Sequence, residues 1–490
     1  MSASISTIRS GIDGLDTLLN GGLVRGRMYL VQGRPGTGKT LLGMHFLETG
    51  LEEGETVLCI HGEESQEEIV SNGLAVGIDV RDAEFLDLGP ESDFFTQDEA
   101  YDLVHPSDLE QEQYTRDIHD AIKEIDPTRV VLDPITQLRY VESSGHQFRK
   151  RMLAFMRFLK QRDITVVATA PSAYDEKSDA EVRSLSDGII ELTRGPDGRR
   201  INPAKHRALG QMEGEHGLEI RQHGIEVYPD VVPVHEETTF DPIALRSGID
   251  ELDDLLEGGF EQQTVTFVSG PSGVGKTTIG TQFMAQAIEE GLTCAAYLFE
   301  ESIETYCHRT ESIGFPISDM RESGDLSVNQ VEPLTLSSEE FAHRIIEQTE
   351  TQGTDVVFID GIDGYTISVR GEESALIRKL HGLTRYLKNE GVTVIFTNEI
   401  SEITGISTAT SPNISYLADN LMFMSYVEMD GRLRKVIGVL KKRTGGFEHS
   451  LREFEITDDG LRVGDPLSGL HGVLQGNPRM SDVRDLAQDE

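Results

Sequence analysis

The stretch GRPGTGKT at residues 33–40 decides the fold of this chain, and GPSGVGKT at residues 270–277 repeats it. Both fit the pattern G-x-x-x-x-G-K-[S/T], in which the backbone amides of a glycine-rich loop surround the phosphates of a nucleotide. Each follows a short apolar run, RMYLVQ or TVTFVS, and precedes an amphipathic segment. The order of strand, glycine loop and helix indicates a nucleotide-binding α/β domain in each half of the chain.

The two loops predict how ATP and Mg²⁺ are held. Lys39 and Lys276 are expected to reach the β and γ phosphates, and the hydroxyls of Thr40 and Thr277 are expected to bind Mg²⁺. The alternative, a glycine turn without a ligand, is disfavoured because the motif occurs twice in the same context. The residues expected to bind the nucleotide are Gly33, Gly36, Thr37, Gly38, Lys39, Thr40, Gly270, Gly273, Val274, Gly275, Lys276 and Thr277.

An internal repeat sets the domain organisation. SGIDGLDTLLNGGL at 10–23 recurs as SGIDELDDLLEGGF at 247–260, an offset of 237 residues that also relates the two lysines of the glycine loops. Asp133 and Asp360 differ by only 227, so the first copy carries ten extra residues. We place them near LGPESDFFTQDEAYDLVHPSD at 88–108, which reads as a solvated surface insertion.

Runs of apolar, β-branched residues alternate with helical segments in both copies, which is typical of a parallel sheet covered on both faces. The sequence therefore predicts an α/β protein: two tandem RecA-like P-loop NTPase domains, each a largely parallel sheet flanked by helices, with a short C-terminal tail. The expected bounds are 1–232 for the first domain, 233–243 for a linker, 244–465 for the second domain and 466–490 for the tail.

Carboxylates follow two further strands of each copy. Asp133 and Asp360 end apolar strands, where a buried carboxylate usually meets a metal ion or its water shell, so we expect them to bind Mg²⁺. The pairs Glu63–Glu64 and Glu300–Glu301 are expected at the carboxyl edge of the sheet, where one glutamate would act as a catalytic base and its neighbour would hold a basic group or water. The alternative for each aspartate is that it only caps the next turn. The alternative for the glutamate pairs is that they lie on the surface without a catalytic role.

Basic pairs stand near the end of each copy, in a chain otherwise poor in lysine. They are Lys205 with Arg207 and Lys441 with Arg443. Such pairs suit a phosphate that is approached from a neighbouring subunit. A solvated surface is the alternative interpretation of each K-x-R triplet.

These features together resemble the KaiC family of RecA-like ATPases over nearly the whole chain. The resemblance rests on the SGID-LD-LL-GG segments, both P-loops, both Glu-Glu pairs, both Asp-ending strands and the closing stretch VIGVLKKRTGGFEHSLREFEITDDG. It implies a homohexamer of two stacked rings with ATP bound between subunits, where Lys205, Arg207, Lys441 and Arg443 contact the nucleotide of the adjacent protomer. It also implies that the first domain mainly hydrolyses ATP, and that the second transfers phosphate to its own residues.

The segment GISTATSPNISYLADN at 405–420 resembles the stretch that KaiC proteins phosphorylate. Ser415 matches the family's serine, but Tyr416 stands where the family has threonine, so the ordered two-site cycle does not carry over. The candidate phosphoacceptors are Ser415, Thr410 and Tyr416; a ring-lining loop without phosphorylation is the alternative. Glu300 matches the base of the second site, and the tail LSGLHGVLQGNPRMS resembles the family segment that binds a regulatory protein.

The charge is strongly acidic in both halves. The chain has 85 acidic and 44 basic residues and a net charge of −41, and only 12 of the basic residues are Lys. Hydrophobic residues make up 37% of the chain, which opposes disorder. This composition is typical of a protein solvated by concentrated salt, so we predict a halophilic setting; an acidic surface for one partner is the alternative. Tight binding of nucleic acid is disfavoured.

Other sequence features exclude further classes. Cys59, Cys294 and Cys307 are odd in number and form no CxxC motif, so they predict neither disulfides nor a zinc site. No apolar run approaches about 18 residues. The start MSASISTIRSGID lacks the basic and apolar regions of a secretory signal. We predict a cytoplasmic protein without a membrane segment.

Three functions compete at this point. The leading one is a KaiC-like ATPase in signalling or circadian-type regulation, with serine/threonine autophosphorylation in the second domain. The second is a DNA-dependent RecA relative, a recombinase or helicase, which the acidic segments after the last parallel strands disfavour. The third is a nucleotide-gated scaffold or transcription regulator that binds ATP but scarcely hydrolyses it.

Overall fold

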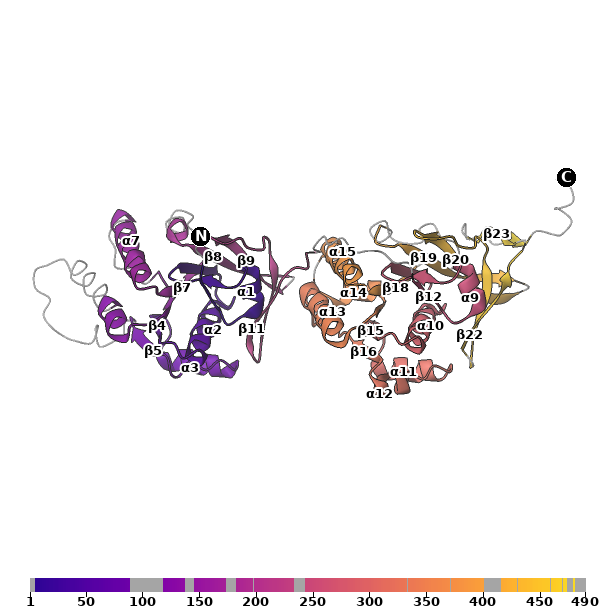
Figure 1. The fold of residues 1–490 in the computed structure, drawn as a ribbon, viewed down its shortest axis with the longest axis horizontal. Helices are drawn as coiled ribbons and strands as arrows, with labels where there is room; N and C mark the ends of the chain where they lie inside the picture. The colour runs from indigo at the N-terminus through magenta and orange to yellow at the C-terminus, as the bar shows by residue number, and fades with distance from the viewer. Residues whose placement is uncertain are drawn as a thin grey trace, which may run out of the picture. The chain divides into compact units, whose positions relative to one another are not determined.

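The computed structural model forms two compact units, Met1–Asp230 and Val231–Glu490 (Figure 1). The structure describes residues 5–88, 118–136, 145–172, 182–196, 198–232, 243–332, 334–370, 372–400, 416–429, 431–458, 460–468, 470–473 and 479–480.

The first unit is built on a nine-stranded sheet of order β11-β10-β9-β8-β3-β7-β6-β4-β5. Its six parallel strands are β3 (Met28–Gly33), β4 (Val57–His61), β5 (Glu84–Asp87), β6 (Arg129–Asp133), β7 (Thr165–Pro171) and β8 (Gly188–Gly195). Three antiparallel strands follow: β9 (Gly198–His206), β10 (His216–Arg221) and β11 (Gly224–Tyr228). The remaining elements are β1 (Thr7–Ile8), β2 (Leu23–Val24), α1 (Asp13–Leu18), α2 (Lys39–Glu52), α3 (Gln66–Ala75) and α7 (Gly145–Gln161).

The second unit repeats this plan with the order β16-β15-β17-β18-β14-β19-β20-β21-β22. Its parallel strands are β14 (Val265–Gly270), β15 (Cys294–Leu298), β16 (Leu326–Gln330), β17 (Val356–Asp360), β18 (Thr393–Glu399) and β19 (Asn420–Met429). The antiparallel strands are β20 (Arg432–Lys442), β21 (Arg452–Thr457) and β22 (Gly460–Pro466). The helices are α9 (Asp250–Leu255), α10 (Lys276–Glu289), α11 (Ile303–Glu311), α12 (Ile317–Ser323), α13 (Ser338–Gln352), α14 (Ile362–Ser368) and α15 (Glu373–Asn389), and short strands are β12 (Ala244–Leu245), β13 (Phe260–Glu261), β23 (Leu470–His471) and β24 (Arg479–Met480).

Both faces of each sheet are covered, as the continuous apolar runs of the central strands require. In β14, Phe267 packs into the core on one face, and its neighbour Val268 packs into the core on the other. In β3, Leu30 and Val31 divide in the same way. The predicted fold class is confirmed: two α/β units, each with a largely parallel sheet between helices.

The central strands β3 and β14 end directly in the glycine loops. Since neighbouring strands are parallel, the carboxyl ends of β3, β4, β6 and β7 meet at one edge, and those of β14, β15, β17 and β18 do the same in the second unit. Open α/β sheets bind ligands at this edge. The fold therefore brings the glycine loop, the glutamate pair and the strand-end aspartate of each copy together.

Some sequence expectations lie outside the described residues. Residues 89–117, which include most of the predicted insertion, are among them, as are 233–242 of the predicted linker. In the predicted tail, β23 pairs with β24. The expected domain bounds stay predictions. Within the described part of the chain, no helix is long and apolar enough to cross a membrane.

Glycines at corresponding positions, Gly43 on α2 and Gly280 on α10, let these helices approach the sheet closely. A Cβ at Gly280 on α10 would lie 2.2 Å from the ring of Phe358, which is fully buried on β17. The matching Gly43 on α2 would meet the smaller Val131 at 3.0 Å. We expect Gly280→Ala to lower the free energy of unfolding by about 2 kcal/mol, because overpacking exceeds the gain in helix propensity.

The measurement is denaturant unfolding at fixed salt, and Gly43→Ala serves as the matched control with a smaller loss. An equal or larger loss in Gly43→Ala would contradict the packing argument.

Candidate functional site

Glycines shape both phosphate loops because the backbone there takes conformations that side chains avoid. Gly36 and Gly38 have φ of 77° and 105°, and Gly273 and Gly275 have φ of 73° and 120°. Gly38 and Gly275 are also the N-caps of α2 and α10, and neither helix has a side-chain cap. The first amides of both helices are thus left for an anion, which the helix dipole also favours.

The two loop lysines fold back onto their own loops. Lys276 Nζ donates to Gly270 O at 2.9 Å and to Pro271 O at 3.1 Å, and Lys39 Nζ donates to Arg34 O at 3.3 Å. Burial lowers the pKa of both lysines, and nearby carboxylates oppose this shift. An anion bound in either loop would take the place of these carbonyl oxygens and would form charge-assisted hydrogen bonds with a half-buried lysine.

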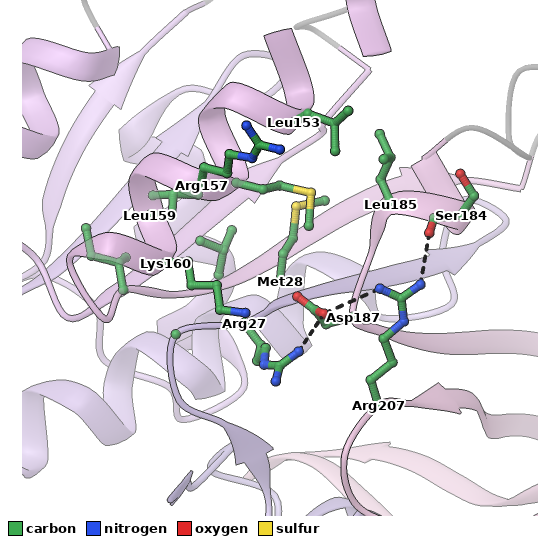
Figure 2. Close-up of a pocket in the computed structure, with 14 residues that line it drawn as sticks. Arg27, Met28, Leu153, Arg157, Leu159, Lys160, Ser184, Leu185, Asp187 and Arg207 are labelled. Carbon is green, nitrogen blue, oxygen red and sulfur yellow. Dashed lines mark hydrogen bonds and ion pairs between the residues drawn. The ribbon is translucent and has the colours of Figure 1, made fainter. Parts of the chain in front are cut away.

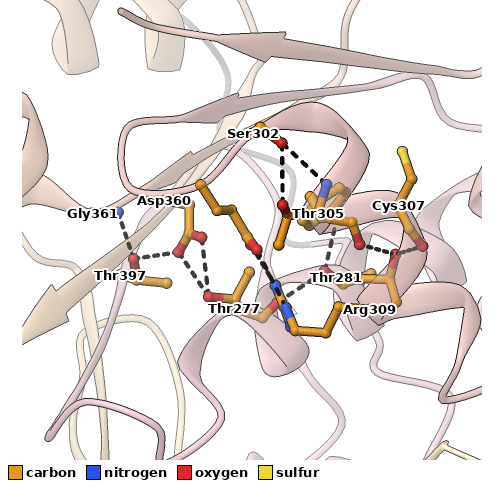
Figure 3. A network of polar contacts seen from close by, with 12 residues as sticks. Thr277, Thr281, Ser302, Thr305, Cys307, Arg309, Asp360, Gly361 and Thr397 are labelled. Atoms are coloured by element: carbon orange, nitrogen blue, oxygen red, sulfur yellow. Dashed lines mark hydrogen bonds and ion pairs between the residues drawn. The ribbon is translucent and has the colours of Figure 1, made fainter. Parts of the chain in front are cut away.

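Asp360 closes the second site at the end of β17, and its side chain is only 6% exposed. Thr277 donates to both of its carboxylate oxygens, at 3.1 and 3.0 Å, and Thr397 donates to Oδ1 at 2.7 Å (Figure 3). Burial raises the pKa of Asp360, which these hydrogen bonds oppose. A hydroxyl and a carboxylate side by side next to a phosphate loop are the hard oxygen donors that Mg²⁺ prefers, so these residues fit that ion.

The first copy places Asp133 at the end of β6, where Thr169 donates to its carboxylate. Thr40 occupies the second position of α2, as Thr277 does in α10. Both Asp133 and Glu63 act electrostatically on Lys39, which raises the pKa of the lysine against the effect of burial. Lys39, Asp133 and Glu63 therefore interact in the first unit, as Lys276, Asp360 and Glu300 do in the second.

Within each glutamate pair, the two side chains have different surroundings. Glu300 interacts electrostatically with Lys276, and its carboxylate lies close to the backbone of Gly361, where an added Cβ would be 2.7 Å away. Burial raises the pKa of Glu300, and Asp360 and other carboxylates raise it further. Glu301 instead pairs with Arg309, with Nη2 to Oε1 at 2.5 Å. The first glutamate of the pair is thus the one turned toward the P-loop lysine.

The first pair shows the same division with a different partner. Glu63 acts on Lys39, whereas Glu64 accepts a hydrogen bond from the amide of Asn72 on α3 at 3.3 Å. Ser65 caps α3 directly after the pair. In both units, the helix that follows the pair therefore holds the second glutamate.

The predicted basic pairs do not lie at this edge. Lys205 is on β9 opposite Ile189, and Arg207 follows the strand beside Asp187, whose amide donates to Met28 O at the start of β3. Met28 precedes Gly33 by five residues, which is about 17 Å along a strand. Lys205 and Arg207 are therefore beyond reach of the P-loop of their own unit.

The second basic pair has the same placement. Lys441 is opposite Leu421 on β19, and Arg443 pairs with Asp419 at 3.3 Å. The amide of Asp419 donates to Val265 O at the start of β14, so these cations also lie at the amino edge of the sheet.

A cavity of about 220 Å³ opens beside Arg207 in the first unit (Figure 2). Arg27, Arg157 and Lys160 also line it, together with one carboxylate, that of Asp187. In a chain of net charge −41, this is an unusual concentration of cations around one cavity.

The phosphoacceptor candidates Thr410 and Ser415 lie outside the described residues. Tyr416 is described and is 47% exposed, with its ring against the ring of His381 at 5.2 Å. It stands four residues before β19, whose first residue, Asn420, pairs with Thr266 near the start of β14. Tyr416 therefore belongs to the edge opposite its own P-loop.

Sequence reasoning missed several polar groups of the second site, namely Arg309, Asp363, Thr397 and Glu399. The repeat holds a signal for them, because the copies differ there. Asp363 corresponds to Thr136 at the offset of 227 that relates Asp360 to Asp133. Strands β18 and β7 correspond at an offset of 228, so Glu399 corresponds to Pro171. A comparison of the two copies at every offset would have indicated the extra charges of the second site.

A family model described as the KaiC ATPase matches residues 8–232 and 245–468. The circadian clock oscillator protein KaiC of Thermostichus vulcanus is 26% identical over 98% of this chain and 93% of its own length. KaiC of Synechococcus elongatus is 27% identical over 99% and 94%, and the circadian clock protein KaiC3 of Synechocystis is 27% identical over 97% and 95%.

The hydroxyl of Thr397 generates a prediction for this site, because it donates to Asp360 and also accepts from Gly361 N at 2.7 Å. Thr397→Val keeps the shape but removes one donor from a buried carboxylate. We expect it to lower the free energy of unfolding at neutral pH by about 1–3 kcal/mol, as measured by denaturant unfolding.

Thr397→Ser is the control, because it keeps the hydroxyl and is expected to lose much less. If the serine variant were as unstable as the valine variant, packing of the methyl group and not the hydrogen bonds would be responsible.

Proposed function

The chain belongs to the KaiC family of ATPases, and we propose that each of its two units binds ATP with Mg²⁺ and hydrolyses it. One observation carries this proposal: each unit gathers a glycine loop, its lysine, a strand-end aspartate and the first glutamate of a pair at the carboxyl edge of its sheet. These are the parts that phosphoryl transfer needs, namely a phosphate cradle, charge neutralisation and a residue to orient the attacking water.

In the second unit, Thr277 and Asp360 would hold Mg²⁺, which when bound neutralises charge on the phosphate oxygens. Lys276 turns from its loop carbonyls to those oxygens. Glu300 orients the attacking water and accepts its proton. Its raised pKa favours this task, because a more basic carboxylate takes up a proton more readily. In the first unit, Thr40, Asp133, Lys39 and Glu63 have these roles.

A neighbouring protomer completes each site in this proposal. Arg207 and Arg443 lie about 17 Å along the strand from their own P-loops, but at an edge that an adjacent copy can present to the phosphates. The cations around the cavity beside Arg207 support the approach of an anion to this edge. A closed ring, a homohexamer in two layers as the family resemblance implies, satisfies this requirement.

We further propose that the second unit transfers phosphate to Ser415, Thr410 or Tyr416, in signalling or circadian-type regulation. The support is the difference between the copies: the second site carries the additional carboxylates Asp363 and Glu399. Since Tyr416 lies at the edge opposite its own P-loop, transfer would run between neighbouring protomers. A cytoplasmic, halophilic setting and a regulatory protein at the C-terminal tail complete the proposal.

Loss of both P-loop lysines tests hydrolysis. Lys39→Ala combined with Lys276→Ala is expected to reduce phosphate release from ATP by more than about a hundredfold, because phosphate charge is then left unbalanced. Each single variant is expected to keep part of the turnover. Lys123→Ala, which removes an exposed lysine, is the control. Persistent turnover in the double variant would refute both sites.

Labelling tests the transfer step. Incubation with γ-labelled ATP and Mg²⁺ in high salt is expected to label the chain, and mass spectrometry is expected to place the phosphate on Ser415, Thr410 or Tyr416. Replacement of all three candidates, by Ser415→Ala, Thr410→Ala and Tyr416→Phe, is expected to remove the label. An unlabelled wild type, or unchanged label in the triple variant, would exclude these acceptors.

A further inference from the structure

Arg309 on α11 forms an ion pair with Glu301, the second glutamate of the pair in the second site. Its Nη2 lies 2.5 Å from Glu301 Oε1, and its Nε lies 3.4 Å from Oε2, so both oxygens of the carboxylate face the guanidinium (Figure 3). The two side chains are 37% and 18% exposed. A two-pronged contact of this kind fixes the orientation of a carboxylate as well as its charge.

Arg309 also packs against Tyr306 of the same helix. The guanidinium lies over the ring of Tyr306 at 5.8 Å, and that ring is fully buried. The hydroxyl of Tyr306 is 2.9 Å from Thr281 Oγ1 on α10, the helix that begins with the P-loop lysine. Arg309 therefore connects Glu301 to the helix that carries the phosphate loop.

The first copy lacks this arginine. At the offset of 237, Arg309 matches Asn72, a neutral side chain that donates one hydrogen bond to Glu64 at 3.3 Å. The two helices begin at corresponding positions, with Ser65 as the N-cap of α3 and Ser302 as the N-cap of α11. The arginine is thus a difference between otherwise corresponding positions.

The charges around the two P-loop lysines differ among the residues that the structure describes. There, Asp133 and Glu63 act on Lys39. Glu300, Asp360, Asp363 and Glu399 act on Lys276. Glu301 and Arg309 both act on Asp360 as well, with opposite effects. An unpaired Glu301 would add a further negative charge to a crowded, partly buried site, which is costly without a cation.

We propose that Arg309 is a positioning residue of the second ATPase site: it holds Glu301 against α11, so that Glu300 is the one glutamate of the pair that faces the P-loop. In the first copy, where Asn72 replaces the arginine, Thr136 and Pro171 stand at the positions of Asp363 and Glu399. This inference rests on the proposed hydrolysis of ATP in the second unit.

The test uses a Lys39→Ala background, in which the remaining turnover comes from the second unit. Adding Arg309→Asn, the first-copy side chain, is expected to lower kcat about tenfold, because a misplaced carboxylate shifts the attacking water. KM for ATP is expected to change less than about twofold, since the phosphate contacts remain. Arg309→Lys, which keeps the charge but loses the fork, is expected to restore part of kcat.

Two further variants separate positioning from general damage. Arg434→Asn removes a comparable ion pair with Glu453 from β20 and β21, with side chains 35% and 24% exposed, and is expected to leave kcat unchanged. Glu301→Gln is the partner in a double-mutant cycle: if Arg309 acts through Glu301, adding Arg309→Asn to Glu301→Gln causes little further loss.

The outcomes are distinct. Unchanged kcat in Arg309→Asn, an equal loss in Arg434→Asn, or fully additive losses in the cycle would overturn the role of Arg309 while hydrolysis by the second unit stands. No turnover in the Lys39→Ala background alone would overturn the second ATPase site itself, and the positioning role with it.

Discussion

Parallel pairing of six strands in each sheet is the constraint on which the sites depend. Parallel strands end at the same edge, so residues that follow different strands become neighbours although they are far apart in the chain. Lys276, Glu300 and Asp360 are brought together in this way, because β14, β15 and β17 all end beside α10. The glycine loop lies at the same edge. Gly275, with a φ of 120°, is the N-cap of α10, and no side chain caps this helix, so its first amides are left for an anion.

The same pairing keeps the basic pairs away. β8 and β19 are parallel to the central strands, so the antiparallel β9 and β20 return their last residues to the opposite edge. Arg207 and Arg443 are held there by Asp187 and Asp419. Each sheet thus has its phosphate loop at one edge and an arginine at the other, and the proposed contact between neighbouring copies depends on this arrangement.

The two copies have the same plan but different electrostatics. The second site concentrates carboxylates around Lys276 and holds one of its glutamates with Arg309. At the matched positions that the structure describes, the first site has neutral residues in place of Asp363 and Glu399, and a neutral Asn72 in place of Arg309. Such differences between equivalent positions within one chain are a natural basis for different duties, because the backbone geometry is shared and only the side chains vary.

The sequence by itself determined the duplication, the α/β class, the two phosphate loops and the family, because each is written in contiguous motifs whose local backbone requirements are strict. The P-loop glycines and the apolar runs before them are examples. It could not determine which side chains meet across the sheet. The Thr397 contact with Asp360, the grip of Arg309 on Glu301 and the distance of Arg207 from its own P-loop depend on strand order and helix packing. Those contacts join segments tens of residues apart, and only the tertiary structure fixes them, since the motifs specify local conformation and not the partner across the sheet.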